Sequence, residues 1–176
     1  MQPRALVSIL AIFLGAMTTQ LALSQGIAVK DIDRTADEWI ALGETVHGGF
    51  GSHIALGIRI GQEALQRLGA KRREVDVKVT EGSNSPCACI ADALMIATSA
   101  SPGQKTLSVL PKSADASYMT VIEIRNRASG STLTYRVPAS AISSLAKMNP
   151  GTTALQRLQI VFAMPASDLY EVAISK

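Results

Sequence analysis

The sequence predicts a single α+β domain, and three patterns carry that prediction. Apolar residues recur at helical spacing over residues 53–69, which indicates a largely buried helix. Residues 74–80 alternate strictly between apolar and polar side chains, as in a strand with one buried face. Residues 118–127 and 131–137 are predicted to be two strands joined across Ala128-Ser129-Gly130. No internal repeat and no shift of composition marks a second domain.

Two helices precede the first strand. Thr35-Ala36-Asp37-Glu38 is a capping-box pattern, and the apolar spacing after it predicts a short helix. This helix delivers His47 to its C-terminal end. A loop over residues 47–52, half of it glycine, then leads into the helix that starts at His53.

The remaining elements are expected in the order helix, three strands and C-terminal helices. Ser85 stands where an N-cap precedes a proline, Pro86, at the first helical position, which predicts an apolar and buried helix over 87–97. Cys87 and Cys89 would then lie in or near its first turn. Beyond it we expect strands at 106–110, 118–127 and 131–137, helical segments at 140–147 and 152–164, and a short tail.

Residues 1–24 are predicted to be a signal peptide. Arg4 precedes an apolar run over residues 5–17, and Ala22-Leu23-Ser24 forms a small-residue cleavage site. The run is shorter than the ~20 apolar residues that span a bilayer, so membrane contact is expected only through the cleavable leader. We therefore expect residues 25–176 to form one mature domain that is periplasmic or secreted.

Charge and composition give little support to a nucleic-acid partner. Loss of Arg4 lowers the net charge from +3 to +2, and aromatic residues make up only 4% of the chain. The one basic run, Lys71-Arg72-Arg73, is interpreted as a solvated turn rather than part of a basic stripe. We expect a small molecule or a metal ion as the partner, and a homo-oligomer is left open.

The residues able to hold a transition metal or to start nucleophilic chemistry gather in two short segments. Both histidines, His47 and His53, flank the glycine loop, and both cysteines, Cys87 and Cys89, stand at the predicted helix start. Free N–H groups and the helix dipole favour thiolates there, most of all at Cys87. A Cys-x-Cys disulfide closes a small strained ring and is an uncommon staple, which leaves free thiols or metal ligands open.

Each of these residues also has a structural interpretation. His47 could cap the preceding helix instead of acting as a ligand or general base, and His53 could simply line the loop. Cys89 could pack as a small hydrophobic side chain. Asp92 is expected to need a partner in its apolar helix, either in a loop-tethering hydrogen bond or in a site, and Arg59 or His47 could supply it.

The glycine loop itself could bind a small anion. Gly48, Gly49, Gly51 and Ser52 stand at the start of a helix, where glycines let backbone N–H groups converge. The pattern lacks the Lys-Ser/Thr pair of a P-loop and does not follow a strand, so it is weak as a phosphate motif.

Two segments of the chain carry a resemblance to a known family. They read H-G-G-F-G-S-H-I-A-L-G from His47 and C-I-A-D-A-L-M-I-A-T-S-A-S-P-G-Q from Cys89. Over residues 47–137 the chain resembles the E-type domain family of formylmethanofuran dehydrogenase. That family carries H-G-H-x-C-P-x-x-x-x-G before a long helix and C-x-x-D-A-x-x-x-x-T-G-C-T-x-G-K before a strand. The resemblance implies an α-β-α-β-β-β core with a mixed sheet.

The chain departs from the family at its metal and thiol positions. His47 and Cys89 are retained, but other positions of that set are now Gly49, Gly51 and Ser99-Ala100-Ser101. A family metal site therefore cannot be carried over whole. A metal held by the two histidines and the two cysteines would be a rebuilt site, for zinc, copper or nickel.

Taken together, these patterns predict an exported binding module similar to that formylmethanofuran dehydrogenase domain. It would hold a metal such as zinc, or a small anion, between the loop at 47–52 and the helix start at Cys87. One alternative is a thiol-dependent redox or transfer enzyme that uses Cys89 or Cys87 with His47. Another is an accessory, partner-binding protein whose site has decayed. The lost ligand positions favour a binding or accessory protein over a stand-alone enzyme.

Overall fold

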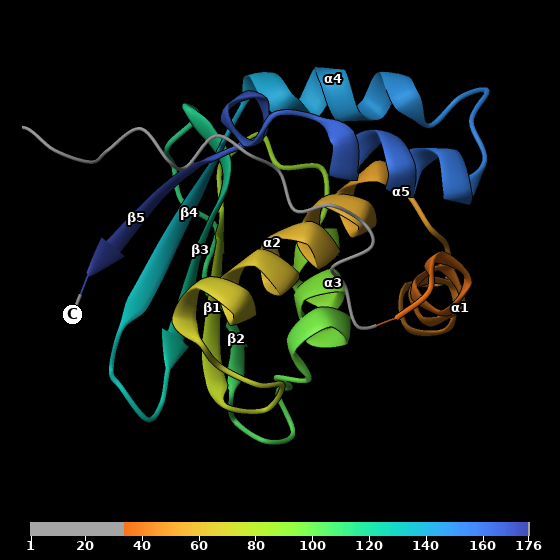
Figure 1. The fold of residues 1–176 in the computed structure, drawn as a ribbon. Helices are drawn as coiled ribbons and strands as arrows, with labels where there is room; N and C mark the ends of the chain where they lie inside the picture. Colours follow the sequence, from red (N-terminus) through yellow and green to blue (C-terminus); the bar gives the residue numbers. More distant parts are fainter. Residues whose placement is uncertain (1–33, 176) are drawn as a thin grey trace, which may run out of the picture.

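The computed structural model describes residues 34–175, which form one α+β domain (Figure 1). The signal peptide predicted at 1–24 lies outside these residues. Within residues 34–175, no helix combines the length and the apolar character needed to cross a bilayer. In chain order the elements are α1 (Ala36–His47), α2 (Ser52–Leu68), β1 (Val75–Glu81), α3 (Cys89–Thr98), β2 (Leu107–Val109), β3 (Tyr118–Asn126), β4 (Thr132–Pro138), α4 (Ser140–Met148), α5 (Ala154–Ala163), the 3₁₀ helix η2 (Ala166–Asp168) and β5 (Glu171–Ser175).

The sheet is mixed, with the strand order β2-β1-β3-β4-β5. β1 runs parallel to β2 and antiparallel to β3, and the later neighbours are antiparallel. The alternation predicted for the first strand is present, because Val75, Val77 and Val79 are buried on one face of β1. The predictions of an α+β class and a mixed sheet are therefore confirmed.

Helices α2 and α3 lie against each other beside the sheet, and they run in the same direction (Figure 1). A Cβ placed on Gly57 would come within 2.5 Å of the Ala93 Cβ, and one on Gly61 within 2.6 Å of the Ala97 Cβ. Real Cβ atoms do not approach so closely, so the glycines allow the two helix backbones to pack in contact. This line of small residues, Gly57, Gly61, Ala93 and Ala97, is called the α2–α3 seam below.

The C-terminal helix α5 fixes α2 from another side. Arg59 is fully buried, and its Nη1 donates to the carbonyls of Val161 and Met164 at 2.5 and 2.7 Å. Charge-assisted hydrogen bonds of this kind compensate in part for the desolvation of a buried guanidinium. Arg59 therefore joins α2 to α5, and it is not the partner of Asp92.

Two elements differ from the sequence predictions. The C-terminal tail contains a strand, β5, whose Val172 and Ile174 alternate with polar or small residues and which pairs with β4. The prediction of a plain tail was wrong because the apolar signal is short and covers only two alternating positions. The second difference, the start of α3, concerns the cysteines and is described below.

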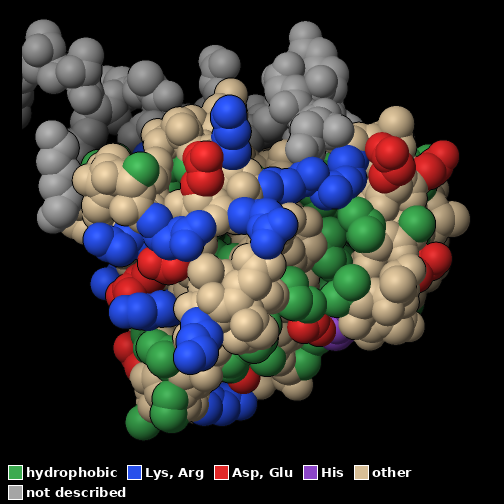
Figure 2. Space-filling view, turned by 90° about the horizontal axis from the view of Figure 1, so that it is seen from below, with side chains coloured by type: hydrophobic (Ala, Val, Ile, Leu, Met, Phe, Trp, Pro, Cys, Tyr) green, Lys and Arg blue, Asp and Glu red, His purple; other side chains and the backbone are tan. Residues whose placement is uncertain are grey.

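Basic side chains are interleaved with acidic ones on the face shown in Figure 2, and they form no continuous stripe there. The run at 71–73 does more than face solvent. Arg72 Nε donates to the Ala97 carbonyl at 3.1 Å, and its guanidinium lies 5.3 Å from the centre of the Trp39 ring. The turn therefore binds to α3 and packs on α1, and the absence of a nucleic-acid partner stays a prediction.

Candidate metal centre

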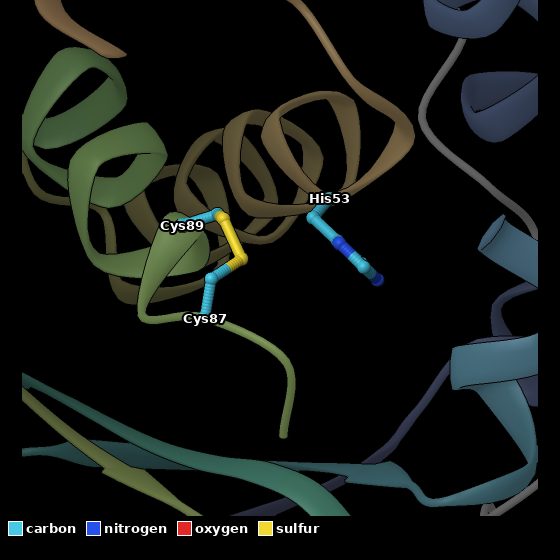
Figure 3. A group of neighbouring side chains, drawn as sticks. All are labelled: His53, Cys87 and Cys89. Carbon is cyan, nitrogen blue, oxygen red and sulfur yellow. A yellow bond between two sulfur atoms is a disulfide. The ribbon is translucent and has the colours of Figure 1, made fainter. Parts of the chain in front are cut away.

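His53, Cys87 and Cys89 come together at the N-terminal ends of α2 and α3 (Figure 3). A ring nitrogen of His53 and the two sulfur atoms all lie within 4.8 Å of one another. Among the described residues, this is the one group of three or more His, Cys, Asp or Glu side chains that could hold a metal. It contains three of the four residues that the sequence offered as ligands of a rebuilt site, and it does not contain His47.

The α2–α3 seam explains why these side chains meet. The pairs Gly57–Ala93 and Gly61–Ala97 are in contact at successive turns of two helices that run in parallel. One turn earlier on each helix the corresponding residues are His53 and Cys89. Side chains four residues apart share a helix face, so the seam places the imidazole beside the sulfur.

Cys87 and Cys89 are joined by a disulfide, with their Cα atoms 5.3 Å apart. None of the cysteines described is free. The expectation of free thiols or standing ligands was therefore wrong for this state of the chain. The small ring made a disulfide look unfavourable, but the observed Cα separation falls in the range that a disulfide requires.

The segment between β1 and α3 shapes this disulfide. Ser85 Oγ donates to Glu81 Oε1 at 2.9 Å and also contacts the Cys87 carbonyl at 3.2 Å, while Lys112 Nζ donates to the Ser85 carbonyl at 2.9 Å. Ser85 therefore caps no helix, and α3 begins at Cys89. The predicted start at Cys87 was wrong because a carboxylate four residues earlier takes the serine hydroxyl.

The two cysteines differ in exposure and in backbone position. Cys87 is exposed and lies outside the helix, whereas Cys89 is partly buried and is the first residue of α3. The free N–H groups and dipole of a helix N-terminus stabilise a thiolate, so this effect acts on Cys89 rather than on Cys87.

His53 has the features of an unused ligand. Its Nε2 is buried and has no hydrogen-bond partner. Burial lowers the pKa of the imidazole, because the charged form is desolvated. A neutral ring is the form that binds metals, and an unsatisfied buried nitrogen gains most from a ligand. Arg59 also leaves two nitrogen atoms unsatisfied, but a guanidinium has no lone pair to offer a metal.

His47 makes a different contact. Its Nδ1 lies 2.8 Å from Asp92 Oδ2, and both side chains are partly exposed, at 29% and 42%. His47 ends α1 and Asp92 stands in the first turn of α3, so the pair ties these two helices together. The partner that Asp92 was expected to need is therefore His47.

The glycine loop is largely occupied by protein contacts. Gly48 takes the left-handed conformation that ends α1, and its N–H donates to the Glu44 carbonyl. Ser52 is fully buried, its N–H donates to Asn149 Oδ1 at 3.1 Å, and its Oγ donates to the Leu145 carbonyl at 2.7 Å. Asn149, which the sequence marked only as part of a helix break, thus caps α2. Gly49 has open space beside it, and Gly51 is the N-cap of α2.

The donor set of the site favours thiophilic metals. Two thiolates and one imidazole suit zinc or other borderline and soft ions, and zinc commonly binds such ligands in a tetrahedron. In that geometry the ligand atoms lie roughly 3.5 Å apart, so atoms already within 4.8 Å need only small shifts. Three protein ligands leave a fourth position for a water or another small ligand.

A protein-family model matches residues 46–169, and its description reads "FmdE, Molybdenum formylmethanofuran dehydrogenase operon". The matched segment includes the candidate site and the elements that build it. The comparison with curated proteins finds no match.

Proposed function

The chain belongs to the FmdE family, and we propose that it is a metal-binding module that holds a thiophilic transition metal, zinc foremost, on His53, Cys87 and Cys89. The family description refers to an operon of a molybdenum enzyme, and the proposal takes neither molybdenum nor an activity from it. It rests on the three ligand atoms that this chain brings together.

The observation that carries the proposal is the buried His53 Nε2 beside two sulfur atoms. The nitrogen lacks any partner, and a ring nitrogen lies within 4.8 Å of both cysteine sulfurs. Three such groups on two helices fixed by the α2–α3 seam form a preorganised donor set. The thiols bind metal only when the disulfide is reduced, because thiolates are the ligands.

The other candidate functions have less support. A small anion in the glycine loop would have to replace Asn149 at the Ser52 N–H, which is already satisfied. A thiol enzyme that uses His47 as its base would have to draw on a ring whose Nδ1 is taken by Asp92. His47 also lies outside the group formed by the cysteines and His53.

The two histidines provide a matched test. The whole mature chain is reduced, freed of metal, and titrated with zinc against a chromophoric chelator. We expect about one zinc per chain, and we expect His53→Ala to weaken binding by more than about 100-fold, since even loss of a residue behind a ligand costs ~10–100-fold. His47→Ala should bind zinc as the wild type does. Equal losses in the two variants, or no zinc bound by the wild type, would reject the proposal.

We also propose that the chain is exported and processed close to Gln25. Support comes from the apolar run and the small-residue exit in residues 1–24. Intact mass of the protein isolated from its host should match a chain that starts at or near Gln25. A chain that keeps Met1 would contradict the proposal.

A further inference from the structure

We infer that the Cys87–Cys89 disulfide and a bound metal are two alternative states of one site, so that oxidation of the cysteines releases the metal and reduction restores the site. The inference rests on the proposed function and assigns it a redox control. It follows from three features: shared atoms, small movements and unequal exposure of the two sulfurs.

The first feature is that both states need the same two sulfur atoms. In the metal-bound state each sulfur is a thiolate that donates a lone pair to the ion. In the disulfide the sulfurs carry no charge, and His53 is left as a single ligand. The unpartnered Nε2 of His53 is what the site retains when the cysteines are oxidised.

The second feature is that the change of state requires little rearrangement. His53 and Cys89 are fixed on α2 and α3, whose backbones pack in contact at the seam. With the disulfide formed, a His53 nitrogen is already within 4.8 Å of both sulfurs. The movement therefore falls on Cys87, which lies in an exposed segment outside the helix.

The third feature is that a soluble thiol can reach one sulfur more easily than the other. Cys87 is exposed, and Cys89 is partly buried at the first position of α3. Attack on the Cys87 sulfur expels the Cys89 thiolate, which the helix N-terminus stabilises as a leaving group. The site is therefore arranged for exchange in one direction, through a mixed disulfide on Cys87.

The exchange balances as follows. The thiolate of a small thiol reductant bonds to the Cys87 sulfur, the bond between the two cysteines breaks, and its electron pair leaves on Cys89. A second reductant thiol then displaces Cys87, so the reductant is oxidised to a disulfide and two electrons have passed to the protein. A divalent metal binds the two cysteines and displaces their two protons. In the opposite direction a small-molecule disulfide accepts the two electrons and is reduced to two thiols, while the metal leaves with its charge unchanged.

The first experiment compares zinc binding by the two states of the whole mature chain. The oxidised form is prepared with its disulfide verified by intact mass, and the reduced form is kept under a phosphine reductant. The reduced form should bind about one zinc, and the oxidised form should bind more than about 100-fold more weakly, because it has lost two of three ligands. Equal affinity would overturn the inference and would place the metal on atoms other than the sulfurs.

The second experiment follows release. Oxidised glutathione is added to the zinc-loaded chain in the presence of a chromophoric chelator, and zinc release and disulfide formation are recorded together. We expect one zinc released per disulfide formed, at the same rate. Cys87→Ser, which cannot form the disulfide, should keep the zinc that it binds, and His47→Ala should respond as the wild type does.

The outcomes separate the inference from the proposed function. A reduced chain that binds no zinc rejects both. A reduced chain that binds zinc through His53 but holds it unchanged while glutathione oxidises a reporter thiol rejects the redox control and leaves the proposed function standing. His53→Ala gives a further check, because it should still form the disulfide although it has lost tight zinc binding.

Discussion

His47 and His53 stand at the two ends of one short loop, yet their surroundings differ in kind. His47 ends α1, is partly exposed and is bonded to the Asp92 carboxylate at 2.8 Å. His53 lies in the first turn of α2, has a buried nitrogen without a partner and faces two sulfur atoms. His47 is the histidine that keeps the family's motif position, whereas His53 is the one with the geometry of a ligand. Motif position and ligand geometry are therefore separate properties in this chain.

The difference follows from which helices carry the two residues. His53 lies on the α2–α3 seam, which fixes it against Cys89, while His47 approaches α3 from the far side of the loop. The polar atoms of His47 and Asp92 satisfy each other, so that pair needs no ligand to account for it. We expect changes at the seam to alter the metal site strongly and changes at the His47–Asp92 pair to alter it little.

The largest of the remaining effects is expected for Gly57→Ala. The new Cβ would lie 2.5 Å from the Ala93 Cβ and 3.0 Å from the Ile90 carbonyl oxygen, so α2 and α3 must separate. Overpacking of this kind costs about 1–3 kcal/mol in the free energy of unfolding. Zinc binding by the reduced chain should weaken as well, because His53 moves away from Cys89. Urea denaturation and zinc titration measure the two effects.

Two variants serve as controls for that prediction. Gly49→Ala places its Cβ in open space, two residues from His47, so stability and zinc affinity should stay close to those of the wild type. Ala93→Gly in the Gly57→Ala background removes the opposing methyl and should restore part of both losses. Failure of the second change to restore anything would mean that the seam does not position the site.

Much of the fold could be predicted from the sequence, because its signals are local. The capping box at Thr35 and Glu38 and the alternation in β1 predict elements that agree with the structure to within a few residues. β5 was missed because its alternating apolar residues are too few to stand out. The start of α3 was misplaced because Glu81, from the preceding strand, competes for the Ser85 hydroxyl.

The candidate site was predictable in composition but not in arrangement. All three ligands were among the residues singled out, since the chain has only two histidines and two cysteines. Their grouping depends on the contact of α2 with α3, and helix contacts between segments far apart in the sequence leave no local signal. The spacing of Gly57 and Gly61, matched by Ala93 and Ala97, was the one available hint of that contact.

Glu63 shows what a buried ionisable group on α2 looks like when it is fully satisfied. It accepts hydrogen bonds from the hydroxyls of Tyr135 and Tyr170 and pairs with Arg67 at 3.0 Å. Burial, reinforced by the Glu63 carboxylate, raises the pKa of both tyrosines well above the ordinary value. Unlike His53, Glu63 leaves no oxygen for a ligand, so its expected role is structural.

An intermediate effect is expected in alkali. Tyr135 and Tyr170 stay protonated in the folded chain, whereas unfolded tyrosine ionises near pH 10. Their contribution is fully present below about pH 10 and is lost as the pH rises toward the folded pKa, at up to about 1.4 kcal/mol per pH unit for each tyrosine. Denaturation at pH 9 to 11 should show this slope, and Tyr170→Phe should reduce it. An unchanged slope would contradict the raised pKa of Tyr170.

The smallest effect is expected for Asp92→Asn, which removes the charge of the His47 partner and keeps its shape. The pair is partly exposed, and ion pairs in such positions contribute about 0–1 kcal/mol to stability. We expect the free energy of unfolding to fall within that range and the zinc affinity of the reduced chain to change by no more than about twofold, as for a substitution worth roughly 0.5 kcal/mol. Zinc titration beside His53→Ala provides the measurement. A loss as large as that of His53→Ala would place Asp92 and His47 inside the metal site and would remove the distinction between the two histidines.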